Sequence, residues 1–249
     1  MRRILSVASV DTVSDLGDRR AQKKAQTREL VRTTAHRLFA SHGFDAVTIA
    51  DVAREADVAV QTVFNHFATK EDLFFDGRVP WVDGVAAAVR DRASDVGPLS
   101  ALRAHLLGFM RDQLSSLDSR EERSYRATLD ASETLRTYER TLVFETEHRL
   151  SRALLDAWRK PDESGEHTPV DPAITAPLTA AIWLAAVRVL IVENRRRVAD
   201  GLAPTEVAAT VELLGDRLMG YMQARSGTFH GLVTESPAVP GVPGDRRAG

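Results

Sequence analysis

Apolar residues recur at helical spacing from Ala21 to Met222, and no segment keeps the alternating apolar and polar pattern of a half-buried strand. Few prolines interrupt these runs, so we predict an all-α protein. The 249 residues are long for one small helical module, and they suit such a module followed by a larger domain. We expect helices over residues 22–42, 98–117, 121–133, 136–160, 174–200 and 204–225.

Short helices with clear start signals follow the first long helix. Thr48 can cap the backbone N–H of Asp51, and apolar residues then recur for about two turns. Asp57 lies where the chain must turn, and a second short helix is expected over residues 60–67. Thr69 begins a further helix with the same capping spacing. Two short helices around a tight turn, braced by a longer one, predict a helix-turn-helix.

The second short helix has an outer face suited to the major groove of DNA. Its outward positions are small or polar, and none is acidic: Val60, Gln61, Thr62, Asn65 and His66. Amide side chains can pair with adenine edges, and methyl groups can contact thymine methyls. Val63 and Phe67 are expected to anchor the helix from its inner side. A plain helical hairpin with a polar face is the alternative interpretation.

Charge is distributed unevenly along the chain. The net charge is −2, but residues 19–70 carry nine Lys/Arg against five Asp/Glu, a local charge of +4. A basic block on an acidic body is what contact with phosphate requires. Arg19, Arg20, Lys23 and Lys24 could reach phosphates or the adjacent minor groove, although a solvated helix start explains the first two equally well.

The residues of this region resemble the DNA-binding domain of the TetR (tetracycline repressor) family. The matching runs are LFASHGFDAVT at 38–48, IADVAREADVAVQTVFNHF at 49–67 and TKEDL at 69–73. The family's usual run reads aliphatic-Phe-x-x-x-Gly-Phe/Tyr, Thr, Ile-Ala-x-x-Ala, Gly-Val-Ser, Tyr-x-His-Phe and Lys-Glu-x-Leu, and this chain follows it without a gap. Beyond residue 75 the resemblance is architectural only.

The resemblance implies roles for individual residues. It makes Gln61, Thr62 and Asn65 base-facing, and it gives phosphate contacts to His66 and Lys70. Thr48 would cap the second helix beside the DNA backbone, with Val60 and Phe64 on the same surface and Lys23 and Lys24 nearby.

Three departures from the family pattern weaken the expected DNA affinity. Asp57 replaces a turn glycine, Ala59 replaces a capping Ser or Thr, and Phe64 replaces a Tyr. Losing the capping hydroxyl costs about 0.5–2 kcal/mol. Phe64 also lacks a hydroxyl that could bond phosphate.

The remaining chain carries no recognisable catalytic or metal-binding motif. It has no Cys, no GxGxxG, P-loop, HExxH or GxSxG run, and its seven His are scattered. We therefore expect no enzyme, cofactor or metal. TetR-like proteins hold a small effector in this domain, which implies a pocket here as well. The candidate lining residues, for which ordinary core is the alternative, are Phe109, Met110, Gln113, Tyr125, Leu129, Tyr138, Phe144 and Trp183.

The last two predicted helices are candidates for a dimer interface. Ile174–Val192 is nearly all apolar and carries a single charge, Arg188. A membrane span is the alternative, but Arg within a membrane core is costly. Paired across a two-fold axis with residues 204–225, whose apolar face is Val207, Val211, Leu214, Leu218 and Tyr221, these helices would form a four-helix bundle. Arg188 should then lie at the edge of the bundle or pair with an acid, Asp216 or Glu212.

Together these features predict a domain organisation and a function. We expect a disordered extension at 1–20, a helix-turn-helix domain at 21–72, an effector-binding and dimerisation domain at 73–226, and a disordered tail at 227–249. The expected protein is a cytoplasmic, ligand-responsive transcriptional regulator, with repression favoured, that binds a palindromic operator as a homodimer and is released by a small-molecule effector. The alternatives are a DNA-binding protein without sequence choice and an enzyme in a helical fold.

Overall fold

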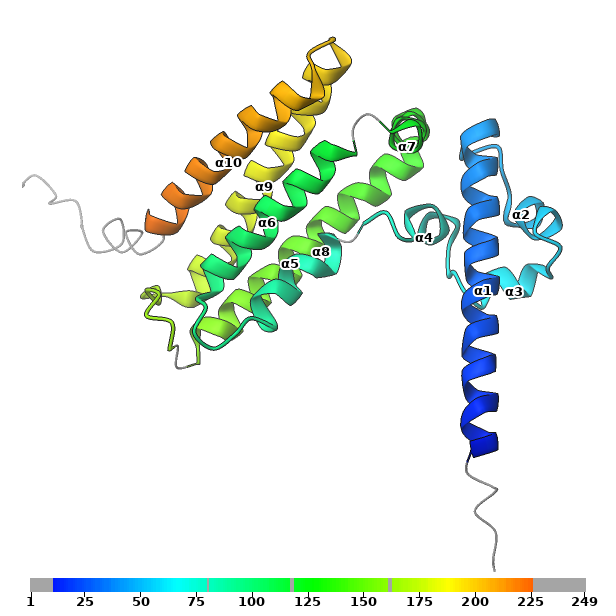
Figure 1. Cartoon of the computed structure of the whole chain (residues 1–249), viewed down its shortest axis with the longest axis horizontal. Coiled ribbons are helices and arrows are strands. Elements are labelled where there is room, and N and C mark those ends of the chain that lie inside the picture. Colours follow the sequence, from blue (N-terminus) through cyan, green and yellow to red (C-terminus); the bar gives the residue numbers. More distant parts are fainter. Residues whose placement is uncertain (1–10, 80, 117–118, 161–162, 226–249) are drawn as a thin grey trace, which may run out of the picture. The chain divides into compact units, whose positions relative to one another are not determined.

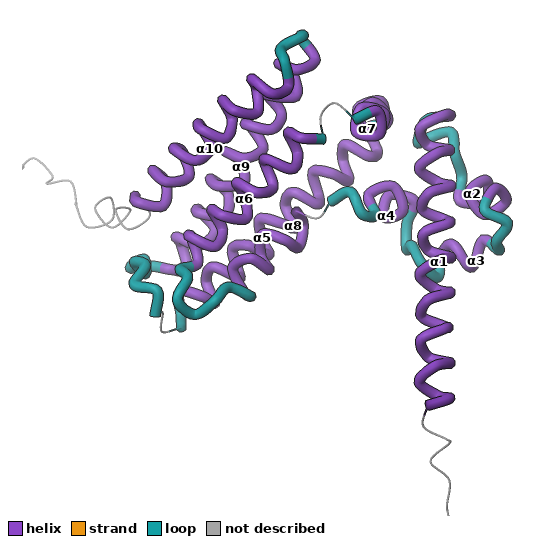
Figure 2. Tube along the Cα trace, in the orientation of Figure 1, coloured by secondary structure: helices purple, strands orange, loops and turns teal. Residues whose placement is uncertain are grey.

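The computed structural model describes residues 11–79, 81–116, 119–160 and 163–225, and these form ten α-helices without a β-strand. The all-α prediction is thus confirmed (Figures 1 and 2). The chain divides into two compact units. The N-terminal unit contains residues 1–80 and 118–143, and the C-terminal unit contains residues 81–117 and 144–249.

The helices of the N-terminal unit are short apart from the first and the last. They are α1 (Asp11–His42), α2 (Ile49–Glu55), α3 (Val60–Phe64), α4 (Lys70–Phe75), α7 (Arg120–Ala131) and the first part of α8 (Glu133–Trp158). Helix α1 begins at Asp11, within the extension that was expected to be disordered at residues 1–20. Residues 1–10 and the expected tail at 227–249 lie outside the described residues.

The expected boundary at residue 72 differs from the one observed. Leu73, Phe74 and Phe75 are almost completely buried in the core of the N-terminal unit, together with Tyr125 and Leu129 of α7. Three successive buried apolar residues cannot leave that core without exposing their surface to water. The chain therefore leaves the N-terminal unit only after α4 and returns to it with α7.

Local signals position the two short helices as the sequence predicts. Thr48 Oγ1 accepts a hydrogen bond from the N–H of Asp51 at 3.1 Å, and the Asp51 carboxylate accepts one from the N–H of Thr48 at 3.0 Å. Asp57 has a φ of 52°, the left-handed conformation expected at the turn. Val63 and Phe67, 0% and 3% exposed, anchor α3 in the core.

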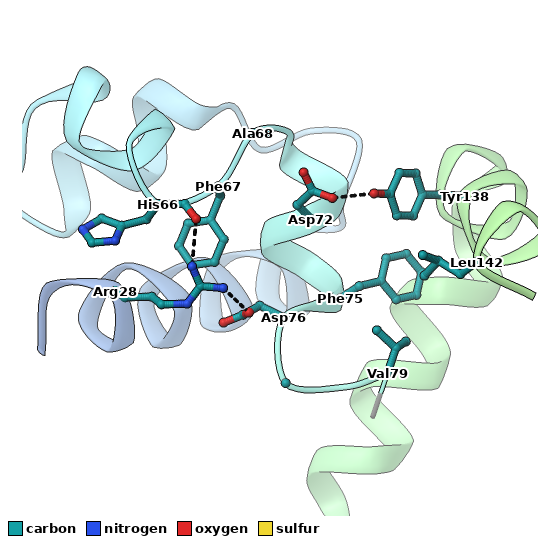
Figure 3. Close-up of a pocket in the computed structure, with 11 residues that line it drawn as sticks. Arg28, His66, Phe67, Ala68, Asp72, Phe75, Asp76, Val79, Tyr138 and Leu142 are labelled. Atoms are coloured by element: carbon teal, nitrogen blue, oxygen red, sulfur yellow. Dashed lines mark hydrogen bonds and ion pairs between the residues drawn. The ribbon is translucent and has the colours of Figure 1, made fainter. Parts of the chain in front are cut away.

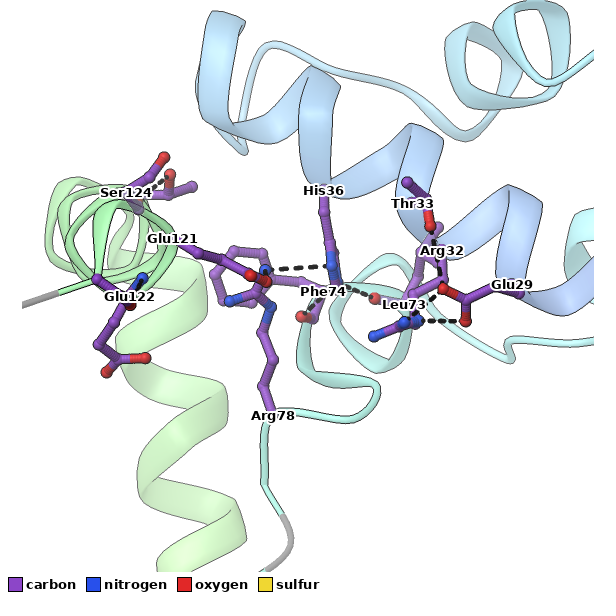
Figure 4. Close-up of polar contacts among 12 residues, drawn as sticks. Glu29, Arg32, Thr33, His36, Leu73, Phe74, Arg78, Glu121, Glu122 and Ser124 are labelled. Carbon is purple, nitrogen blue, oxygen red and sulfur yellow. Dashed lines mark hydrogen bonds and ion pairs between the residues drawn. The ribbon is translucent and has the colours of Figure 1, made fainter. Parts of the chain in front are cut away.

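A half-buried histidine links α1 to the end of α4. His36 Nε2 lies 3.2 Å from the carbonyl oxygen of Leu73 and 3.1 Å from that of Phe74, and Arg78 Nη2 lies 3.2 Å from Nδ1 (Figure 4). The arrangement suits a neutral ring that donates from Nε2 and accepts at Nδ1. Arg78 also pairs with Glu121 of α7 at 3.2 Å, so the network joins three helices.

The C-terminal unit is a bundle built from α5 (Trp81–Arg90), α6 (Pro98–Ser115), the rest of α8, α9 (Pro172–Ala199) and α10 (Pro204–Arg225). The sequence analysis did not anticipate α5. Its buried residues Val82, Val85, Ala86 and Val89 have the spacing of a helical face, but the helix is only ten residues long. The side chain of His105 in α6 packs so close to Gly84 that an added Cβ there would lie 3.0 Å from the ring.

Within one chain, Arg188 of α9 is exposed and does not pair with either acid expected for it. Asp216 pairs with Arg103 of α6 at 2.7 Å, and Glu212 pairs with Arg111 of α6 at 3.0 Å. The place of Arg188 at the edge of a two-fold bundle stays a prediction. By length and composition alone, α9 is the one helix of the described residues that could cross a membrane, and 44% of its most apolar stretch is buried within the unit.

Protonation of His36 should destabilise the N-terminal unit. Burial, reinforced by the positive charge of Arg78, lowers the pKa of His36 from 6.5 to about 4. Because the folded state favours the neutral ring, its contribution to stability is complete above pH 6.5 and is lost as the pH falls toward 4. We expect the free energy of unfolding to fall over this range in the wild type and to fall less in His36→Gln, measured by chemical denaturation. An unchanged profile in His36→Gln would contradict the assignment, and His148→Gln, at an exposed position, serves as the control.

Candidate nucleic-acid interface

Helix α3 presents a mixed apolar and amide surface to solvent. Val60 and Phe64 are 42% and 46% exposed, and Gln61 and Asn65 are also exposed. The Gln61 amide donates a hydrogen bond to Asn65 Oδ1 at 3.2 Å, so the two amides lie side by side. Thr62 and His66 are half-buried. A surface of this kind can form hydrogen bonds and methyl contacts with base edges.

Basic residues of α1 lie against one edge of this surface. A groove of about 440 Å³ is lined by Arg20, Lys23, Lys24 and Thr27 of α1 and by Thr62, Asn65 and His66 at α3. The structure therefore brings Lys23 and Lys24 together with three of the residues expected at the DNA. Helix α1 thus places three basic side chains and one threonine beside α3. Such a surface can bind the phosphate groups of DNA.

The surroundings of His66 disfavour its charged form. Burial lowers the pKa of His66, and the positive charges of Lys24 and Arg28 lower it further. A phosphate bound beside the ring would act in the opposite direction, because a negative charge favours the charged form.

Arg28 of α1 holds the end of α3 in place. Its Nη1 donates to the backbone carbonyl of His66 at 2.8 Å, its Nη2 forms an ion pair with Asp76, and its guanidinium lies 4.4 Å from the ring centre of Phe67 (Figure 3). The sequence analysis gave this residue no role, because a basic residue near a helix start carries no signal of a partner 38 positions away. Arg28 therefore ties α1 to the end of α3 and to the end of α4.

Lys70 has a different place from the one expected. Its ammonium donates to the carbonyl oxygens of Phe44 at 3.1 Å and Val47 at 3.0 Å, and it lies 4.1 Å from the ring centre of Phe44. Two of its three N–H donors are thus used within the unit. This geometry favours a role in bracing the loop before α2 over the predicted phosphate contact.

The two helix starts at the interface differ in their caps. Thr48 caps α2 with its hydroxyl, as predicted. Ala59 precedes α3 and makes no side-chain cap, because its methyl group cannot accept a hydrogen bond. Helix α3 is therefore held mainly by tertiary contacts through Val63, Phe67 and the carbonyl of His66.

The residues expected to line an effector pocket are divided between the two units, and three of them lie in the N-terminal unit. Tyr125 stacks on Phe74 with ring centres 5.0 Å apart, and burial raises the pKa of Tyr125 to about 12. Leu129 is 1% exposed in the same core. Tyr138 donates a hydrogen bond to Asp72.

The other five expected pocket residues lie in the C-terminal unit. Met110 and Trp183 are buried in its core, and Phe109 packs against that core. Gln113 accepts a hydrogen bond from Arg195 at 2.5 Å, whereas Phe144 is 71% exposed. Met110 and Trp183, like Tyr125 and Leu129, are thus buried in the core of their unit, and the effector pocket stays a prediction.

Comparison with known proteins supports the interpretation of the interface. Residues 31–76 match the family described as bacterial regulatory proteins, tetR family. The chain is 28% identical over 148 residues to a protein of Mycobacterium tuberculosis described as a mycofactocin biosynthesis transcriptional regulator, MftR, covering 56% of this chain and 63% of that protein. It is 29% identical over 103 residues to the HTH-type transcriptional regulator TcmR of Streptomyces glaucescens, covering 40% of this chain and 46% of that protein.

A solved structure shows the same fold at lower identity. The SmeT–triclosan complex superposes with a TM-score of 0.50 and 16% identity, over 80% of this chain and 91% of that one. This likeness concerns the arrangement of helices only.

Substitutions at Lys24 and Lys70 should separate a phosphate contact from a structural brace. Lys24→Ala should weaken binding to all DNA sequences and lower the slope of log affinity against log salt by about 0.9. Lys70→Ala should leave that slope unchanged but lower the free energy of unfolding by about 1–3 kcal/mol, because two carbonyls lose their donor. Salt titrations of DNA binding and denaturant titrations measure the two effects. If Lys70→Ala instead lowers the slope of log affinity against log salt and keeps wild-type stability, then Lys70 contacts a phosphate.

Proposed function

We propose that this chain, whose residues 31–76 match the tetR family of bacterial regulatory proteins, is a ligand-responsive transcriptional regulator of the cytoplasm. It binds a palindromic DNA operator as a homodimer, and a small-molecule effector releases it. Repression is the favoured sign of regulation. The observation that carries the proposal is the exposed face of α3 beside the basic residues of α1.

An exposed apolar stripe on α9 supports the homodimer. Large apolar side chains that are 43–60% exposed recur along one face of this helix, at Ile174, Leu178, Ile182, Val189 and Val192. Ala185 is exposed at the middle of the stripe. A contiguous apolar stripe of this length in contact with water is unusual for a monomer and marks an interface.

Helix α10 adds a second exposed stripe, although only part of the face expected from the sequence is available. Val207 and Val211 are buried within the unit, whereas Leu213, Leu214 and Tyr221 are 52–60% exposed. Two such helices from each copy, related by a two-fold axis, would bury both stripes in a four-helix bundle.

A two-fold axis in the dimer accounts for a palindromic operator and for release of the protein from DNA by an effector. A dimer presents two copies of α3, which fit half-sites about 34 Å apart on one face of the duplex. An effector that binds more tightly to a dimer with a different spacing shifts the population away from the DNA-bound form.

Substitutions on α3 test sequence recognition. Gln61→Ala and Thr62→Ala should each relax the choice of particular base pairs, by about 1–3 kcal/mol per position, because they remove groups that face base edges. Selection of genomic fragments by the purified protein, repeated with each variant, measures this effect. The same selected sequence for all three proteins would contradict the placement of α3, and equal competition by random DNA would favour binding without sequence choice.

A charge on the α9 stripe tests the homodimer. Ala185→Glu would place an unpaired carboxylate at the contact between copies, where desolvation strongly disfavours it. We expect a monomer with weakened operator binding by sedimentation and DNA titration. Ala104→Glu, the same change at an exposed position of α6, is the matched control and should remain dimeric. A wild type that sediments as a monomer, or a dimeric Ala185→Glu variant with normal affinity, would contradict the proposal.

A further inference from the structure

A cavity of about 450 Å³ lies within the N-terminal unit, among α1, α4 and the first part of α8 (Figure 3). Its apolar walls include Phe67, Phe75, Val79 and Leu142. The ring of Phe75 stacks on that of Tyr138 with centres 5.4 Å apart, which gives the cavity a flat aromatic side. This volume is in the range that accepts a small organic molecule.

The charged groups of the cavity favour a cation. The lining residues Asp72, Asp76 and Arg28 carry a net charge of −1, and the guanidinium of Arg32, outside the lining, also interacts with Asp76. Both oxygens of Asp72 already accept hydrogen bonds, from Tyr138 and from the N–H of Thr69. Asp76 accepts from Arg28 through Oδ1, and among the described residues no donor reaches its Oδ2. One carboxylate oxygen therefore remains available beside an apolar, aromatic wall.

We propose that this cavity binds a small organic cation with a flat apolar body, which pairs with Asp76 and packs its body against Phe75 and Tyr138. An amidinium or guanidinium fits the site best, because one of its two parallel N–H groups can bind Oδ2 of Asp76 while the other competes with Arg28 for Oδ1. The aromatic wall accepts the apolar part and also attracts the positive charge.

Occupancy of the cavity acts on α3 through Arg28. A cation bound to Asp76 competes with Arg28 for the carboxylate, and Arg28 also holds the carbonyl of His66 at the end of α3. The ligand therefore loosens a contact that positions the face of α3. This consequence rests on the proposed function, whereas the binding of the cation does not.

Calorimetric titration of the full chain with benzamidine tests the site directly. We expect saturable binding of one molecule per chain, about tenfold tighter than that of benzamide, which has the same shape without the charge. Benzoate, which carries the opposite charge, should not bind. Equal binding of benzamidine and benzamide, or no saturable binding of benzamidine, would overturn the proposal.

Three variants locate the binding. Asp76→Asn removes the charge and should abolish the preference for benzamidine, while Leu142→Trp fills the cavity from its apolar side and should abolish binding altogether. Asp83→Asn is the matched control, because Asp83 also pairs with an arginine, Arg149, but lies in the C-terminal unit. Circular dichroism confirms that each variant is folded. Unchanged benzamidine binding in a folded Leu142→Trp variant would overturn the site.

A separate measurement addresses the consequence for DNA. Saturating benzamidine should lower the affinity of the wild type for its selected operator and leave that of Leu142→Trp unchanged. Binding of benzamidine with no selectable operator would refute the proposed function and leave the cation site standing. An operator that binds equally well with and without saturating benzamidine would refute the link through Arg28.

Discussion

The N-terminal unit depends on the burial of one aromatic ring, that of Phe74 in α4. Its centre lies 6.0 Å from that of Phe39 in α1, 5.7 Å from that of Phe44 in the following loop, and 5.0 Å from that of Tyr125 in α7. Each such pair contributes about 0.5–1.5 kcal/mol beyond the apolar area it buries. Three segments far apart in the chain thereby meet at one residue.

Polar contacts then fix the directions of the helices around this core. Lys70 closes the loop before α2 through two carbonyls, His36 and Arg78 hold the end of α4, and Arg28 holds the end of α3. Hydrogen bonds are directional, whereas apolar contacts are not. Since α3 is only five residues long and lacks a side-chain cap, its orientation follows from these contacts more than from its own helical propensity.

The basic residues of the N-terminal unit fall into two groups, according to whether their N–H donors are exposed or already used within the unit. Lys23 and Lys24 are exposed beside α3, where they are available to phosphate, while Arg28 and Lys70 are engaged within the unit. Basic residues that look equivalent in the sequence thus differ in whether their donors are available. The same distinction applies to the apolar residues of α10, where Val207 and Val211 serve the core of the C-terminal unit and Leu214 and Tyr221 remain exposed.

The sequence by itself determined the all-α class, the capped starts at Thr48 and Thr69, the turn at Asp57 and the inward positions of Val63 and Phe67. All of these follow from hydrogen bonds and periodicity within a few residues. Only the tertiary structure decided that Tyr125 and Leu129 join the N-terminal core. It also decided that Lys70 donates to backbone carbonyls and that Arg28 donates to the carbonyl of His66. In the C-terminal unit it decided that the two acids expected near Arg188 pair with arginines of α6 instead. Those contacts join positions tens of residues apart, and no local pattern records them, because their geometry exists only once the helices have packed.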